Sequence, residues 1–167
     1  MTFKKAVGKL HLWLGLSSGL VVFIVALTGC IYVFQKEISE TIKHNVFFVN
    51  PASQVLPLSL LSQKATASLS SAKPLNFITT YRHPDRAWEF AAYKAGNKDA
   101  ISYFDALAYY DVVYIDPHTG RITGQIDYKY EFFNVIKNLH WSLLLNTPYG
   151  QPIVGYATLI FFVMLSK

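Results

Sequence analysis

The sequence predicts an α+β membrane protein, in which two apolar membrane segments flank a folded domain of helices and antiparallel strands. Three observations support this class. Residues Leu10–Phe34 contain no Asp, Glu, Lys or Arg, the middle of the chain alternates apolar and polar residues between turn motifs, and Ile153–Ser166 is again apolar. A composition of 52% apolar and 16% aromatic residues fits such a chain.

The segment Leu10–Phe34 is long enough to be a transmembrane helix. Its 25 residues span about 37 Å at 1.5 Å per residue, against a hydrocarbon core of about 30 Å. A closely packed neighbouring helix is predicted by the segment's small residues, which are Gly15, Gly19 and Gly29 with Ser17, Ser18 and Thr28. An alternative is a lipoprotein signal ending at Cys30, since Leu27-Thr28-Gly29-Cys30 resembles a lipobox. The apolar run before Cys30 is too long for that signal and continues beyond it.

The charge distribution bears on orientation and on partners. The net charge of +5 is spread thinly along the chain, which excludes a nucleic-acid binder. The single cysteine excludes an internal disulfide and a thiolate zinc site. Lys4, Lys5 and Lys9 precede the first helix and only Lys36 and Lys43 follow soon after it, which slightly favours a cytoplasmic N-terminus. The central domain then lies in a bacterial periplasm or its equivalent.

We expect three regions: residues 1–35 as cytoplasmic tail and first transmembrane helix, 36–130 as the periplasmic domain, and 131–167 as an interfacial helix and second transmembrane helix. Helical spacing and strand alternation predict the elements between the membrane segments. They are a helical extension at Gln35–Lys43, an interfacial anchor or, less favoured, a short strand at Phe47–Val49, a helix at Leu58–Ser70, a hairpin with strands around Phe77–Tyr81 and Trp88–Ala92, strands at Ala108–Ile115 and Arg121–Gln125 joined by the turn Asp116–Gly120, and a helix at Phe132–Leu145.

The end of the chain predicts a second membrane helix that is interrupted and short. The stretch Asn146–Pro152 contains two prolines and a glycine, and we expect it to break the helical pattern. The apolar stretch Ile153–Ser166 has 14 residues, fewer than a full span needs. The sequence therefore looks cut off partway through, or just at the close of, this helix.

His11 and His140 are the candidate functional residues. Each lies in or beside an apolar segment, where an ionisable or metal-binding side chain costs several kcal/mol unless a partner compensates. A competing interpretation places both at the membrane interface beside the anchoring residues Trp13 and Trp141. We expect little ligand role for the histidines in predicted turns or on the helical extension, where side chains are ordinarily solvated: His44, His83 and His118. The sequence has no GxSxG, HExxH or phosphate-loop motif, which disfavours a self-contained hydrolase.

Several motifs together resemble the PepSY-associated transmembrane family, which includes iron-regulated membrane proteins and inner-membrane ferric-siderophore reductases. They are His11-Leu12-Trp13-Leu14-Gly15, Thr28-Gly29, Tyr114-Ile115-Asp116-Pro117-His118-Thr119-Gly120 and Asn138-Leu139-His140. The resemblance implies a four-helix protein of the bacterial inner membrane with a periplasmic PepSY domain. It also implies haem carried on membrane histidines and electrons passed outward to ferric chelates.

On this resemblance we expect the N-terminal portion of a haem-dependent reductase that acts on ferric siderophores during iron uptake. His11 and His140 would be axial ligands of b-type haem iron, and no residue is predicted to be catalytic in itself. The family pattern has further helices, so we expect partner helices from a C-terminal half or from a second subunit, and an inactive fragment without them. The alternative function is a membrane-anchored PepSY module for binding or inhibition, with an exposed sheet as its contact surface.

The two histidines are expected to bind different haems. His11 opens the first helix, whereas the chain has crossed the membrane before it reaches His140. The imidazoles then lie near opposite faces of a core about 30 Å thick. A re-entrant helix at Phe132–Leu145 would bring His140 deeper, but still not to the inner face.

Overall fold

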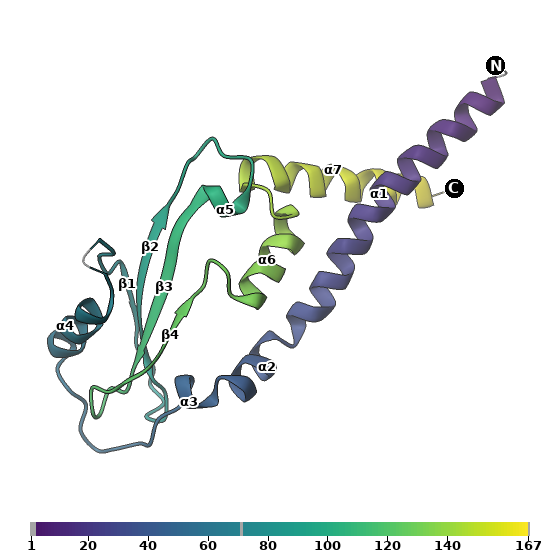
Figure 1. Ribbon diagram of the computed structural model, residues 1–167. Helices are drawn as coiled ribbons and strands as arrows, with labels where there is room; N and C mark the ends of the chain where they lie inside the picture. Colours follow the sequence, from purple (N-terminus) through teal and green to yellow (C-terminus); the bar gives the residue numbers. More distant parts are fainter. Residues whose placement is uncertain (1–2, 71, 167) are drawn as a thin grey trace.

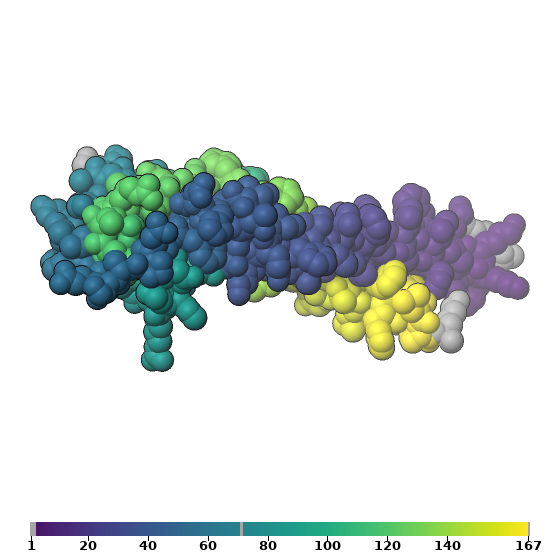
Figure 2. Space-filling model, turned by 90° about the horizontal axis from the view of Figure 1, so that it is seen from below, coloured from purple at the N-terminus to yellow at the C-terminus, as the bar shows by residue number. Residues whose placement is uncertain are grey.

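Two long helices and a four-stranded sheet form opposite ends of the molecule (Figure 1). The computed structural model describes residues 3–70 and 72–166. Helices α1 (Phe3–Val33) and α7 (Thr147–Leu165) contact each other, and both are long and apolar enough to cross a membrane. The sheet and the shorter helices form a lobe from which α1 projects (Figure 2). The predicted class, an α+β membrane protein, is confirmed.

Helix α1 leads directly into the domain. It begins at Phe3, so the lysines before the apolar run belong to the helix. The helical path is interrupted at Phe34, and α2 (Gln35–Ile42) continues it, as predicted for the helical extension. Lys43 then forms an ion pair of 2.6 Å with Glu131, whose side chain is 8% exposed. This pair fixes the end of α2 to the residue that precedes α6.

Helix α7 corrects the prediction at the chain end. The stretch Asn146–Pro152 does not interrupt the helix, which begins at Thr147 and runs for 19 residues. Pro148 lies in the first turn, where backbone N–H groups have no helical partner, so it costs no hydrogen bond. Pro152 removes only one hydrogen bond from the helix interior. The helix is about 28 Å long, close to the thickness of the hydrocarbon core.

The sheet occupies the segments that alternation predicted. Its strands are antiparallel, in the order β1 (Phe77–Thr79), β2 (Trp88–Ala95), β3 (Leu107–Ile115) and β4 (Ile122–Asp127). Helix α4 (Leu58–Ser68) covers one face, where Leu61 and Phe90 have no exposed surface. Burial of such side chains contributes about 1.5–3 kcal/mol each.

The interpretation of Phe47–Val49 as a membrane anchor is wrong. Phe47 ends the short helix α3 (His44–Phe47), and its ring lies 5.1 Å from that of Tyr114 on the second face of the sheet. The N–H of Val49 donates to the carbonyl of Asp85 at 2.8 Å. The apolar residues on this face need a cover, and the segment provides it. Both faces of the sheet are therefore packed against helical or extended chain.

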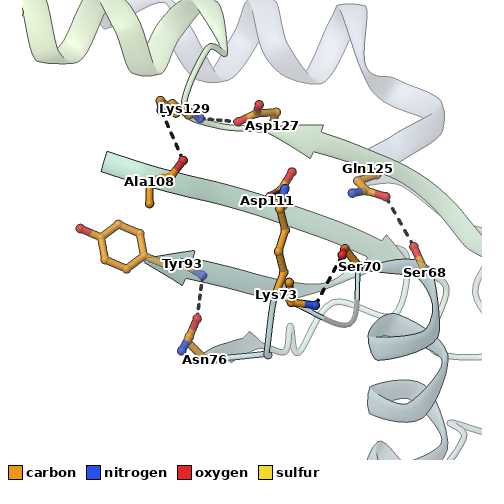
Figure 3. Close-up of polar contacts among 11 residues, drawn as sticks. Ser68, Ser70, Lys73, Asn76, Tyr93, Ala108, Asp111, Gln125, Asp127 and Lys129 are labelled. Carbon is orange, nitrogen blue, oxygen red and sulfur yellow. Dashed lines mark hydrogen bonds and ion pairs between the residues drawn. The ribbon is translucent and has the colours of Figure 1, made fainter. Parts of the chain in front are cut away.

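Polar side chains close the ends and edges of the sheet (Figure 3). The N–H of Tyr93 donates to the side-chain oxygen of Asn76 at 2.6 Å, which extends the pairing beyond β1. Lys73 forms an ion pair of 2.5 Å with Asp111, which is 5% exposed. The N–H of Lys129 donates to the Asp127 carboxylate at 2.9 Å at the end of β4. These contacts fix the segment before β1 and the end of β4, and the edge strand β1 has only three residues, which limits pairing with another sheet.

The domain is joined to the membrane helices through a short helix that was not predicted, α5 (Tyr103–Ala106). Ser102 caps it, because its hydroxyl accepts from the N–H of Phe104 at 3.2 Å. The N–H of Tyr103 donates to the carbonyl of Leu144 at 2.9 Å, in the connection between α6 and α7. The position of α6 is thereby fixed by the sheet as well as by α1.

The turn Asp116–Gly120 forms as predicted. The Asp116 carboxylate accepts from the N–H of His118 at 2.8 Å and from the hydroxyl of Thr119 at 2.6 Å. Gly120 has φ of +70°, a left-handed conformation that glycine adopts without strain. Burial acts to raise the pKa of Asp116, but the hydrogen bonds from Thr119 and from the backbone lower it overall.

His118 is not simply solvated, in contrast to the expectation for turn histidines. Its Nδ1 lies 2.7 Å from the carbonyl of Gln54, and its Nε2 lies 2.8 Å from the carbonyl of Pro84. Carbonyl oxygens only accept, so both contacts are hydrogen bonds only when both ring nitrogens carry hydrogen. The two carbonyls, helped by Asp116, raise the pKa of His118. The cationic ring joins three loops at the end of the domain remote from α7.

We expect domain stability to decrease as the pH rises through the folded-state pKa of His118. Because that pKa is raised, the stabilisation is fully present below the unfolded value of about 6.5 and is lost above the folded value. Thermal denaturation of the protein between pH 5.5 and 8.5 measures this slope. The variant His118→Gln should flatten it, and an unchanged slope in that variant would refute the assignment.

Candidate functional site

The site is built on α6 (Phe132–Ser142). The helix begins as predicted, and Glu131 caps it by accepting from the N–H of Asn134 at 2.9 Å. It ends three residues before the predicted Leu145, because Leu143 and Leu144 are left-handed, with φ of 55° and 59°. This conformation costs roughly 1–2 kcal/mol per non-glycine residue. The strained connection turns the chain sharply from α6 into α7.

His140 contacts α1 through one ring nitrogen. Its Nδ1 lies 2.8 Å from the backbone carbonyl of Val25 and 3.4 Å from the hydroxyl of Thr28. Since the carbonyl only accepts, Nδ1 carries the hydrogen and donates it. In the neutral ring, Nε2 then has a free lone pair. No described residue forms a hydrogen bond with Nε2, so this atom is available to an external ligand.

Gly29 makes this approach possible. A Cβ atom at this position would lie 3.1 Å from Cε1 of His140 and 3.3 Å from its Nδ1. Thr28, beside it, is 3% exposed, and its hydroxyl donates to the carbonyl of Ile24 at 2.7 Å. The prediction of a close neighbour is therefore confirmed at Gly29, which faces α6, and at Gly19, which faces the ring of Phe161 on α7. It is not confirmed at Gly15, where a Cβ atom would have nothing within 4 Å.

The joint between α6 and α7 holds His140 in place. A Cβ atom at Gly150 would lie 2.1 Å from the carbonyl oxygen of Ser142 and 2.5 Å from its Cβ. The Ser142 hydroxyl donates to the carbonyls of Asn138 and Leu145, at 3.1 and 2.8 Å. The helices are thus in backbone contact two residues beyond His140. Glycine is the residue that such a distance permits.

His11 lies on the same side of α1 as the contacts of His140. It precedes Gly29 by 18 residues, which is about five helical turns, so the two residues share one line along the helix. His11 is half-buried, as are Gly15, Val22 and Gly29 on the same stripe. The level of Val25, where His140 binds, is 14 residues or about 21 Å from His11 along the axis. The structure therefore does not bring the two histidines together.

The described residues contain no group of three or more His, Cys, Asp and Glu side chains that could hold a bare metal ion. His11 instead stands singly on the apolar helix α1, and His140 stands singly on α6, where its ring contacts α1. A single imidazole with a fixed tautomer is the arrangement that an axial ligand of haem iron requires. Hydrogen bonding to Val25 is the type of second contact that orients metal-ligating histidines.

A family model described as PepSY-associated TM region matches residues 9–166. The chain belongs to this family. The match begins before His11 and ends at Ser166, directly after α7, so it covers the apolar part of α1, the sheet and all of α7. This PepSY-associated chain is a membrane protein. A comparison with curated proteins returns no match.

Sequence reasoning missed two features of the PepSY-associated site. The partner of His140 is the backbone carbonyl of Val25, and a carbonyl has no sequence signal. The close contact of Gly150 with Ser142 was also missed, because its stretch was interpreted as an interruption rather than as helix. A glycine inside an apolar helix was the available signal, as it had been for Gly29.

Proposed function

We propose that the protein binds haem in the membrane and transfers electrons to ferric chelates, with His140 and His11 as axial ligands of separate b-type haems. The observation that carries the proposal is the hydrogen bond from His140 Nδ1 to Val25. It fixes the ring and its tautomer, and leaves Nε2 for iron. The position of His11 on the same stripe of α1 supports a second site about 21 Å away along the helix axis.

The chain's own residues supply orientation and an apolar environment. Haem would provide one-electron transfer, and the protein tunes it through the ligand and its surroundings. Val25 and Gly29 hold the His140 ring against α1. The apolar surfaces of α1 and α7 lower the local dielectric and exclude water from the imidazoles. Those surfaces are exposed over much of their length, which favours further helices that would cover them. Such helices would come from a C-terminal half or from a second subunit.

The proposed direction of electron transfer depends on how the chain is oriented in a bacterial inner membrane. Lys4, Lys5 and Lys9 lie on the end of α1 remote from the sheet, which favours a cytoplasmic N-terminus and a periplasmic domain. Electrons would then pass from the His11 level to the His140 level and outward to a ferric siderophore. The His140 level is the nearer of the two to the domain, because α6 follows β4 after residues 128–131.

The alternative, a binding or inhibitory module, has less support. It relied on an exposed sheet as the contact surface. Helix α4 and the segment around Phe47 cover much of both faces of the sheet, and the strand side chains that stay exposed, such as Phe77 and Tyr93, are scattered. That function would also not use His140 as a ligand.

Absorbance spectroscopy of the full-length gene product, purified from membranes, tests the proposal. We expect a Soret band and sharp α and β bands on reduction with dithionite, as low-spin haem with imidazole ligands gives. A ferric chelate added to the reduced protein should return the oxidised spectrum. Protein without a Soret band after expression with haem supplementation would refute the haem function.

A further inference from the structure

A second site lies on α6, on a face other than the one that contacts α1. It is a cleft of about 250 Å³ between α6, the ends of β2 and β3, and the start of α7. Tyr93 and Tyr110 line it from the sheet, and Lys137, Asn138 and Trp141 line it from α6. The cleft lies at the junction of the domain and the membrane helices, within one helical turn of His140.

Lys137 brings an uncompensated positive charge to this cleft. Its side chain is half-buried, and in residues 3–70 and 72–166 no ion pair or hydrogen bond to its amine is found. Lys43 and Lys73, by contrast, each have a carboxylate partner within 2.6 Å. Burial lowers the pKa of Lys137, and Glu131 only partly offsets this effect. A half-buried amine without a partner favours an anion beside it.

Aromatic side chains form the walls around this charge. The rings of Tyr93 and Tyr110 lie edge to face, with centroids 5.6 Å apart. Trp141 is 58% exposed, so its ring has a free surface at the mouth of the cleft. The Tyr93 ring projects from β2 away from the Lys73 contacts (Figure 3). Within the described chain the hydroxyls of Tyr93 and Tyr110 have no partner, and both can donate to an anion.

The asparagines beside the cleft already form hydrogen bonds within the protein. The Asn138 amide donates to the carbonyl of Asn134 at 2.7 Å, and the Asn134 amide donates to the hydroxyl of Tyr103 at 2.8 Å. They fix the walls and offer no further charge. Among the described lining residues, the donors without a hydrogen-bond partner include the amine of Lys137, the phenols of Tyr93 and Tyr110, the indole N–H of Trp141 and the hydroxyl of Thr147. Of these groups, only Lys137 carries a charge.

We propose that this cleft binds a small aromatic anion, whose ring contacts Trp141 and the tyrosines while its carboxylate or phenolate faces Lys137. The same chemistry is offered by a free aromatic acid and by an aromatic acid that chelates a trivalent metal. The chelate would connect the cleft to the proposed reductase function, but the ligand class rests on the cleft alone. Stacking on an aromatic wall together with a charge-assisted hydrogen bond is the expected mode of recognition.

Calorimetric titration of the full-length protein in detergent tests this inference with two probes, 2,3-dihydroxybenzoate and its gallium(III) complex. Gallium is redox-inert, so binding is measured whether or not the protein carries haem. We expect saturable binding of at least one probe, and binding at least tenfold weaker for uncharged catechol. Binding should also quench tryptophan fluorescence, and the variant Trp141→Phe should lose this quenching. Binding of the free acid alone would indicate a site for aromatic acids. Tighter binding of the gallium complex would indicate a site for a chelate.

The matched variants are Lys137→Gln and Lys94→Gln. Lys94 is an exposed lysine on β2 that does not line the cleft, and it serves as the control. We expect Lys137→Gln to weaken binding at least tenfold while its denaturation temperature is unchanged, and Lys94→Gln to bind as the wild type. Absence of binding by both probes, or equal binding by Lys137→Gln, would overturn the inference. Binding by a protein that lacks a Soret band would support the cleft and refute only the proposed function.

Discussion

Replacing Gly150 with alanine is expected to destabilise the protein by about 3 kcal/mol or more, and to separate α6 from α7. The new Cβ would lie 2.1 Å from the carbonyl oxygen of Ser142, which is backbone and cannot rotate away. Overpacking of this kind typically costs about 1–3 kcal/mol, and more where backbone must move. The measurement is the thermal denaturation midpoint of the purified protein in detergent.

Gly155 in the same helix provides the matched control. A Cβ atom there has nothing within 4 Å. Gly155→Ala should leave stability unchanged or raise it by up to about 1 kcal/mol, since alanine is the better helix former. Equal denaturation midpoints for the two variants would show that the contact between Gly150 and Ser142 is not tight in solution. Because Ser142 follows His140 by two residues, Gly150→Ala should also perturb any haem spectrum, whereas Gly155→Ala should not.

Replacing His140 with alanine is expected to reduce the rate of ferric-chelate reduction at least about 100-fold. Loss of a group that only orients a metal ligand costs about 10–100-fold, so loss of the ligand itself should cost more. The assay follows reoxidation of the dithionite-reduced protein by a ferric chelate in a stopped-flow spectrometer. His83→Ala is the control, since His83 is an exposed turn residue. A variant His140→Ala that reduces the chelate at the wild-type rate would exclude His140 from the electron path.

Much of the fold was predictable because local patterns and tertiary contacts agree. The strands β2 and β3 follow alternation and lie in one antiparallel pair, with Ala91 opposite Val112. The turn Asp116–Gly120 follows from its own side-chain hydrogen bonds and its glycine. Helix α7 was misjudged for two reasons. Pro148 lies in the first turn, where the hydrogen bond that a proline would remove is already absent, and the loss of one hydrogen bond at Pro152 does not end the helix.

The candidate site was only partly predictable. An isolated histidine in an apolar segment indicated function, but its contacts depend on tertiary geometry. The His140 ring reaches the Val25 carbonyl because Gly29 lets α6 approach α1 closely. The early end of α6 could not be predicted from composition, because Leu143 and Leu144 are ordinary helix formers that adopt left-handed backbone conformations here. His118 was likewise expected to be solvated, and its two carbonyl partners come from loops distant in the sequence.

The central claim is that His11 and His140 hold separate haems at different levels of α1, about 21 Å apart along the helix. The most direct measurement is haem content per chain, determined by the pyridine haemochrome method on the full-length protein and on His11→Ala and His140→Ala. Two haems in the wild type and one in each variant are the predicted result. A single haem in the wild type that is lost in either variant would mean that both imidazoles bind one iron, and would contradict the account.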